Sequence, residues 1–341
     1  MKKLNQKGIT LVALVITIIV LMILAGVSLS FVLGDNGILK KAQESTDAYK
    51  NASQSEQQTL QNIENYLYGE KGGNNTGDNT TGGGDNTTTG GGGSTNPPTT
   101  NKISKSTSYV GYYADIDADG TVDGVIYADK AVGGSGSWGS SNKTSYTIPT
   151  VTEGLKDYSI SQESYTGKFG TKAVISPTGT GEERFYIMAL TDIDGKTEGT
   201  YYDWYHAAYD KKISDWSTIT STKFGTGKTN TATMIAKWNA KAYGDQDTCS
   251  YHKDMWGQIQ TKVKDGWFVP SKEEWAAFGG ELGISKDSSN EKYYGNFGLS
   301  DYYWSSSLFG TYVAWYARFT NGSMGNHYVR EYRSVRLGAT F

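Results

Sequence analysis

The sequence predicts an α+β protein with a long amino-terminal helix, a flexible linker and an outer domain of mixed strands and helices. Three observations lead to this fold class. An uncharged apolar run fills residues 9–33, residues 69–100 hold little besides Gly, Asn and Thr, and aromatic and β-branched residues return from Lys102 onward. The 341 residues include 25 Tyr and 9 Trp, which predicts that the outer domain is rich in strands or loops and has an aromatic core. A net charge of −3 argues against a nucleic-acid partner.

The apolar run of residues 9–33 is long enough to cross a membrane as a transmembrane helix. It would measure about 37 Å at about 1.5 Å per residue, against about 30 Å for a hydrocarbon core. Lys2, Lys3 and Lys7 precede the run and Asp35 follows it. The positive-inside rule then places the amino terminus in the cytoplasm. We therefore expect a single-pass protein of the cell membrane with an extracellular carboxy-terminal domain, or, as the alternative, a signal peptide cleaved near residues 25–28.

The lysines, Gly8 and the following run ITLVALVITIIVLMILAG resemble the class III leader of bacterial type IV pilins and pseudopilins. The resemblance implies that a prepilin peptidase cleaves between Gly8 and Ile9, which removes residues 1–8 and leaves Ile9 as a methylated amino terminus. It also implies pilin-like assembly through the amino-terminal helix. Ala13 stands where pilins usually carry a Glu that pairs with a neighbouring amino terminus. This departure counts against the usual filament assembly.

The helix is expected to continue as an amphipathic stalk over residues 34–68. Apolar residues from Ile38 to Leu67 recur at steps near three, four, seven and eight, which is the period of one helical face. Residues 69–100 then form a Gly/Thr/Asn linker that cannot build a core. A flexible chain of this length spans roughly 30 Å. The linker therefore separates the stalk from a β-rich segment, residues 101–179, and from a final domain, residues 180–341.

An Asp-rich turn opens the β-rich segment. Its carboxylates have the spacing of positions 1, 3, 5 and 9 of an EF-hand calcium loop, with Gly120 at position 6. Position 12 is Ile126 instead of Glu, and the flanking residues have the pattern of strands, so the pattern predicts a Ca²⁺-binding β-turn and not an EF-hand. A plain Asp-Gly hairpin with solvated carboxylates is the alternative. The predicted metal ligands are Asp115, Asp117, Asp119 and Asp123.

Residues with catalytic chemistry are few. Cys249 is the only cysteine, and it forms a C-x-x-H pair with His252, without a second pair to complete a zinc site. Only His206 and His327 accompany His252, and no G-x-S-x-G motif is present. The sequence therefore predicts that the protein is not an enzyme.

The most informative motif is DGWFVPSKEEWAAFGGEL, residues 265–282. Residues 267–269 are expected to form a short buried strand. Ser271 and Glu274 have the spacing of a capping box, and Trp275, Phe278 and Leu282 share one face of the helix that follows. Residues 302–307, 312–319 and 333–341 have the alternation of strands, separated by Gly and Asn turns.

In this order, these motifs resemble the C-type-lectin-like superfamily in its formylglycine-generating-enzyme-like, DUF1566 and major paralogous domain forms. The matching positions run from Trp267 through Pro270 to Trp275, then over Tyr303–Ser306, and end at Val335 and Arg336. The resemblance covers residues 180–341 and implies a C-type-lectin-like mixed α+β domain. The enzyme of that superfamily uses a pair of cysteines, which this chain lacks.

The last residues also resemble the variable proteins of diversity-generating retroelements, which display substitutable positions on a lectin-like scaffold. The predicted function is a membrane-anchored, pilin-like surface protein whose lectin-like domain binds an extracellular protein or glycan in recognition or adhesion. A structural subunit of a type IV pilus or a type II secretion-like system is the alternative. The predicted ligand-binding residues are Leu308, Phe309, Thr311, Tyr312, His327, Tyr328, Arg330, Glu331 and Arg333.

Overall fold

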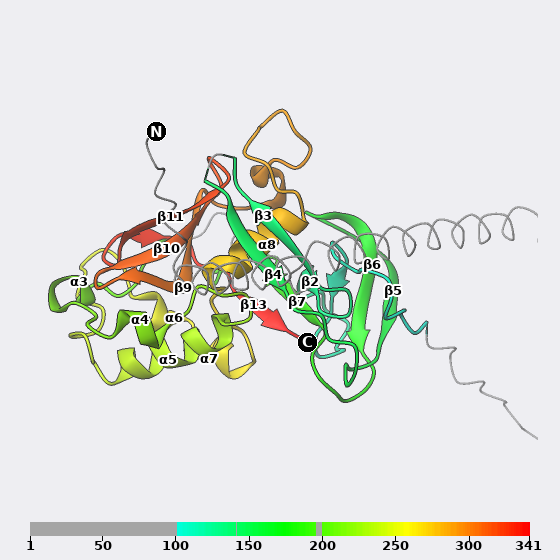
Figure 1. Ribbon diagram of the computed structural model, residues 1–341, viewed down its shortest axis with the longest axis horizontal. Coiled ribbons are helices and arrows are strands. Elements are labelled where there is room, and N and C mark those ends of the chain that lie inside the picture. Colours follow the sequence, from blue (N-terminus) through cyan, green and yellow to red (C-terminus); the bar gives the residue numbers. More distant parts are fainter. Residues whose placement is uncertain (1–100, 141, 196–199) are drawn as a thin grey trace, which may run out of the picture. The chain divides into compact units, whose positions relative to one another are not determined.

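The computed structural model describes residues 101–140, 142–195 and 200–341, and most of its regular elements are strands (Figure 1). Six of these strands form one sheet in the order β13-β7-β2-β1-β6-β5. Neighbours are antiparallel except for β1 and β6, where Tyr113 lies opposite Val174 in a parallel pair. The strands are β1 (Tyr113–Ala114), β2 (Gly124–Asp129), β5 (Tyr158–Gly167), β6 (Gly170–Pro177), β7 (Phe185–Ala189) and β13 (Gly338–Thr340). The sheet thus combines strands from both sides of residue 179.

The remaining strands form smaller sheets. A three-stranded antiparallel sheet has the order β11-β10-β9, with β9 at Tyr302–Gly310, β10 at Val313–Arg318 and β11 at Ser323–Tyr328. These positions confirm the strands predicted for residues 302–307 and 312–319, although burial along β9 does not alternate. Two short pairs complete the set: β3 (Gly134–Trp138) with β4 (Thr144–Ile148), and β8 (Tyr202–Asp203) with β12 (Tyr332–Arg333).

The described helices are short, and α3 to α7 gather beside β9–β11 (Figure 1). The longest of the described helices is α5, with 13 residues, Gly227–Asn239. Together with Trp204, Trp256 and Trp304 the helices bury one aromatic cluster against the three-stranded sheet. The other helices of this group are α3 (Ala208–Lys211), α4 (Trp216–Ile219), α6 (Met255–Gln258) and α7 (Gln260–Lys264), and a 3-10 helix, η1, spans Tyr294–Phe297.

The predicted fold class was wrong for the part of the chain that the structure describes. That part is mostly β-sheet with short helices. All regular elements within residues 101–189 are strands, and the helices between β8 and β9 are four to thirteen residues long. Among the described residues no helix combines the length and the apolar composition needed to cross a bilayer, so the predicted single-pass membrane localisation finds no support in this part of the chain. The predicted leader, cleavage site at Gly8 and Ile9, membrane helix 9–33, stalk 34–68 and linker 69–100 all lie outside the described residues.

Helix α8 (Lys272–Glu281) occupies the centre of the core and confirms the predicted capping box. The Ser271 hydroxyl accepts a hydrogen bond from the Glu274 backbone N–H, and the Glu274 carboxylate accepts one from the Ser271 N–H at 2.6 Å. Trp275 and Phe278 are fully buried, as their shared helical face predicts. The strand expected at residues 267–269 reduces to a single bridge between Phe268 and Gly338.

Glu274 is completely buried and also receives the N–H of Gly225 at 3.1 Å, which ties the start of α5 to α8. A side chain at Gly227 would meet the Glu274 Oε2 atom and the ring of Phe268, so this position needs glycine for the close approach. Burial raises the pKa of Glu274 to about 7, although the backbone N–H groups around it favour the charged form.

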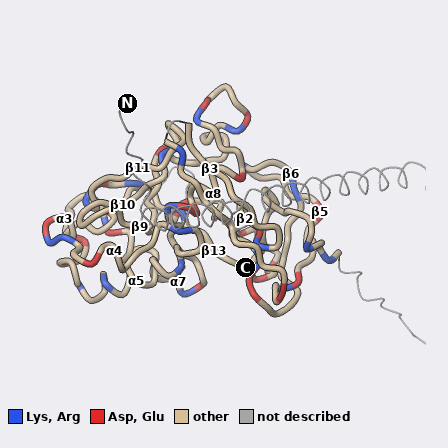
Figure 2. Tube along the Cα trace, in the orientation of Figure 1, with Lys and Arg blue, Asp and Glu red and all other residues tan. Residues whose placement is uncertain are grey.

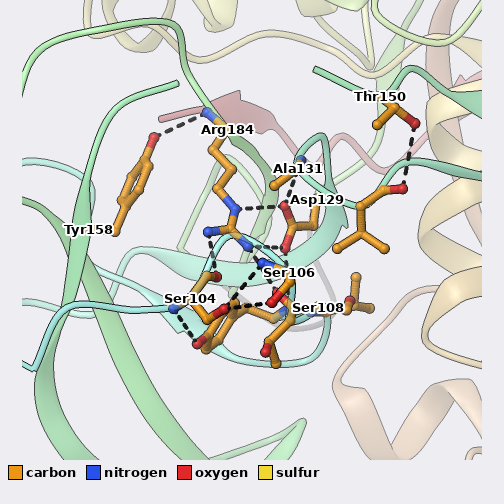
Figure 3. Close-up of polar contacts among 12 residues, drawn as sticks. Ser104, Ser106, Ser108, Asp129, Ala131, Thr150, Tyr158 and Arg184 are labelled. Atoms are coloured by element: carbon orange, nitrogen blue, oxygen red, sulfur yellow. Dashed lines mark hydrogen bonds and ion pairs between the residues drawn. The ribbon is translucent and has the colours of Figure 1, made fainter. Parts of the chain in front are cut away.

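A buried ion pair joins the end of β2 to the start of β7 in the six-stranded sheet (Figure 3). The guanidinium of Arg184 donates to both carboxylate oxygens of Asp129, each at 2.8 Å, and both side chains are 1% exposed. The remaining donors of Arg184 reach the backbone carbonyls of Ser104 and Thr107 at 3.0 and 2.9 Å. The first described residues are thereby fixed to the ends of β2 and β7.

We expect Arg184→Met to lower the free energy of unfolding by about 3–5 kcal/mol, because it leaves the Asp129 carboxylate buried without its partner. Urea denaturation of the full-length chain measures this loss. The matched control is Lys237→Met, which breaks a half-exposed pair with Asp215 and should cost about 1 kcal/mol or less. Equal losses of unfolding free energy in the two variants would contradict the stabilising role of the Arg184–Asp129 pair.

The raised pKa of Glu274 predicts a pH dependence of stability. The ordinary pKa of a glutamate, 4.5, applies in the unfolded state, and the pKa of about 7 applies in the folded state. Between these two pH values the folded state keeps a proton on Glu274 that the unfolded state releases. Raising the pH through this window therefore favours unfolding, by up to about 3 kcal/mol. Denaturation at a series of pH values should show that Glu274→Gln loses this slope and that the exposed control Glu291→Gln keeps it. An unchanged slope in Glu274→Gln would refute the prediction.

Candidate functional site

Three partly exposed tyrosines meet at one end of the three-stranded sheet. Tyr209 comes from α3, Tyr312 from the turn between β9 and β10, and Tyr328 from the end of β11. Their ring centroids are 5.1 Å apart for Tyr209 and Tyr328, and 5.7 Å apart for each of the other two pairs. Every ring of this tyrosine cluster therefore packs against the other two.

Backbone pairing sets the positions of these rings. Val313 lies opposite Tyr328 in the β10–β11 ladder, and the N–H of Val329 donates to the carbonyl of Tyr312 at 3.0 Å. The segment that carries Tyr209 is fixed by a hydrogen bond from Tyr205 N–H to the Val329 carbonyl, also 3.0 Å. The cluster is thus built by the fold and does not depend on a ligand for its order.

Arg330 and His327 extend the tyrosine cluster. The Arg330 guanidinium carbon lies 3.6 Å from the centroid of the Tyr209 ring, which is a stacked cation–π contact. The His327 ring lies 5.3 Å from that of Tyr328, and a hollow of about 240 Å³ opens beside them, lined by Val313, Asn326, His327 and Tyr328. Tyr312 and Tyr328 are 37% and 40% exposed, so ring surface remains for a ligand.

The structure brings together four of the predicted ligand-binding residues, Tyr312, His327, Tyr328 and Arg330. Thr311 and Glu331 border them: the Thr311 carbonyl accepts a hydrogen bond from Ile213 N–H, and Glu331 N–H donates to the Tyr328 carbonyl.

The other predicted residues lie elsewhere. Leu308 is 4% exposed and belongs to the core, where it lies in the same buried cluster as Trp304 and Ala314. Phe309 is exposed but packs on Trp315, whose ring also carries the ammonium group of Lys272 at 3.8 Å. Arg333 packs its guanidinium over Tyr316, 4.8 Å from the ring centroid.

Tyr209 is the member of the tyrosine cluster that the sequence did not predict. It lies in α3, far from the carboxy-terminal strands along the chain, in a segment without a motif. Asp210 and Lys211 follow it in the same helix, and Figure 2 shows acidic and basic residues side by side around α3. The edge of the tyrosine cluster therefore carries mixed charge, like the polar rim of a protein–protein interface.

The Asp-rich turn brings three of its four predicted carboxylates together. Ligand oxygens of Asp115, Asp117 and Asp123 all lie within 4.8 Å of one another, close enough to share one cation. Asp119 is not in this group, and its carboxylate accepts the Thr121 N–H at 2.7 Å. Burial, with repulsion from the neighbouring carboxylates, raises the pKa of Asp123 although the Ile116 N–H favours its charged form. Three clustered oxygen donors suit a hard cation such as Ca²⁺.

Comparison with known proteins gives little. No family model matches the chain, and no curated protein matches it. A solved structure of a fimbrial protein from Bacteroides ovatus is similar at 18% identity and a TM-score of 0.31, over 46% of this chain and 36% of that chain. The match spans about a third of the fimbrial protein. Nothing in these comparisons supports the pilin leader or the C-type-lectin-like domain.

We expect millimolar Ca²⁺ to raise the melting temperature of the full-length chain, since it would relieve the repulsion among the three carboxylates. Asp117→Asn removes one charged ligand and should abolish most of the shift. Asp287→Asn is the matched control, because Asp287 makes the same type of turn contact with Ser289 outside the cluster. A melting temperature that Ca²⁺ leaves unchanged would favour the plain hairpin.

Proposed function

We propose that the described residues form a recognition domain of a surface protein, and that the domain binds a protein partner through the tyrosine cluster and Arg330. The observation that carries the proposal is the mutual packing of three partly exposed tyrosine rings, with a guanidinium stacked on one of them. Tyrosine and arginine are the side chains that most often dominate protein–protein binding. Binding, as opposed to catalysis, is thus the proposed role.

The order of the cluster before binding supports this proposal. Tyrosine has few rotatable bonds, and the rings of Tyr209, Tyr312 and Tyr328 already restrain one another. Association would then cost little side-chain entropy. The stacking on Tyr209 likewise holds Arg330 in one orientation, with its donors available to a partner carboxylate or carbonyl.

A protein partner is favoured over a glycan by the shape of the site. The hollow beside Tyr328 is bounded by four residues, and exposed ring surface of Tyr312 and Tyr328 lies next to it. Mixed charge borders the cluster at Asp210 and Lys211. Aromatic residues surrounded by such a rim are typical of interfaces that exclude water at the centre.

Peptides selected from a phage-displayed random library against the full-length chain test the proposal. We expect most selected peptides to bind Tyr328→Ala at least about tenfold more weakly, the loss of one contact residue worth about 1.4 kcal/mol. Tyr251→Ala is the matched control, because Tyr251 is a tyrosine 89% exposed outside the cluster.

Two results would overturn the proposal. Peptides that bind Tyr328→Ala and the unaltered chain equally would place the contact surface elsewhere. Binding to a glycan array that Tyr328→Ala abolishes, without any peptide binding, would replace the protein partner by a carbohydrate.

A further inference from the structure

Three side chains of metal-binding types, His206, Cys249 and His252, surround the buried carboxylate of Asp203. Ligand atoms of Asp203, Cys249 and His252 all lie within 4.8 Å of one another. The Nδ1 atom of His206 lies 2.8 Å from Asp203 Oδ2. The sequence contains the two pairs as D-x-x-H at 203–206 and C-x-x-H at 249–252, and the fold sets them side by side.

The backbone holds Asp203 on both sides. Asp203 lies in β8, opposite Tyr332 of β12, and its N–H donates to the Lys253 carbonyl at 2.9 Å. Its side chain is 0% exposed. The Oδ2 atom is engaged by His206, whereas Oδ1 is buried and has no hydrogen bond. An unsatisfied buried carboxylate oxygen is costly, so Oδ1 is a position that calls for a cation.

The loop that supplies Cys249 and His252 is closed by two reciprocal hydrogen bonds. Asp247 N–H donates to the Asp254 carboxylate at 2.9 Å, and Asp254 N–H donates to the Asp247 carboxylate at 2.8 Å. The His252 ring stacks on Tyr332, with centroids 4.5 Å apart, and its Nδ1 lies 3.8 Å from Asp203 Oδ1. The cysteine and the histidine therefore face the unpartnered oxygen from a fixed loop.

A catalytic Cys-His-Asp triad fits this geometry less well. In a triad the carboxylate binds the histidine that activates the cysteine. Here the short contact of Asp203 goes to His206, and the histidine next to Cys249, His252, is 3.8 Å away from the carboxylate. Converging ligand atoms account for the arrangement without a nucleophile.

We propose that Asp203 Oδ1, Cys249 Sγ and a ring nitrogen of His252 bind one zinc-type ion, with the fourth position of a tetrahedron left to water. A mixed sulfur, nitrogen and oxygen set selects such an ion over Ca²⁺ or Mg²⁺. His206 is then a positioning residue that holds the second oxygen of the ligating carboxylate. The ion would link β8 to the 247–254 loop, two segments distant in the sequence.

Titration of the metal-free, full-length chain with Co²⁺ and Zn²⁺ tests the site. We expect one equivalent of Co²⁺ to give tetrahedral visible bands and a thiolate-to-metal charge-transfer band, and Zn²⁺ to displace it. Since the chain has one cysteine, Cys249, that band reports this site alone. Tetrahedral bands without the charge-transfer band, or no binding at all in the unaltered chain, would overturn the proposal.

Substitutions distinguish the proposed metal ligands, Cys249 and His252, from the neighbouring residues His206 and Ser250. We expect Cys249→Ser and His252→Gln to weaken Zn²⁺ binding at least about 100-fold, and His206→Gln to weaken it about 10–100-fold while the charge-transfer band persists. Ser250→Ala, in the same C-x-x-H turn, is the matched control and should bind as the unaltered chain does. Undiminished Zn²⁺ binding by folded Cys249→Ser would refute the assignment.

Discussion

The buried guanidinium of Arg184 is the constraint on which the arrangement of the described residues depends. Its donors reach the end of β2 and the segment at residues 104–107. The backbone N–H of Arg184 donates to the Tyr158 hydroxyl of β5, and the rings of Tyr109 and Phe185 pack against the guanidinium. A charge at 1% exposure is tolerated only with its hydrogen bonds made. The six-stranded sheet, which is assembled from distant segments, therefore has one register at this point.

The helices beside β9–β11 depend on other contacts, since they are too short to be stable alone. They are held by buried indoles: the Trp204 N–H donates to the Ser305 carbonyl, the Trp238 N–H to the Asp254 carboxylate and the Trp275 N–H to the Trp304 carbonyl. These contacts fix the loops that carry the tyrosine cluster and the Asp203 group. Both candidate sites lie on loops and on the short elements beside them, and aromatic packing beneath these segments makes them rigid.

Sequence reasoning succeeded where the signal was local. The capping box at Ser271 and Glu274, the buried face of α8 and strands β9 and β10 follow from spacing within a few residues. It failed where contact depended on folding. Leu308 was predicted to bind a ligand, but its side chain lies in the buried cluster of Trp304 and Ala314. Tyr209 and Asp203 gave no signal, because their partners lie on strands and loops remote in the chain.

The fold-class prediction failed for a related reason. Strand and helix motifs in a given order resemble a lectin-like domain, yet order along the chain does not determine pairing. The observed sheet inserts β1 between β2 and β6 and adds β13 beside β7. Residues 101–179 therefore share a sheet with the last strand, a topology that no short motif encodes.

The position of β13 has a consequence for how the polypeptide is made. Strand β7 pairs on one edge with β2 and on the other with β13, and Phe341 covers the rings of Tyr158 and Phe185. These contacts join residues that leave the ribosome at widely separated times. Such long-range pairing slows folding, so most of the aromatic interior stays open to chaperones until synthesis has passed its final strand.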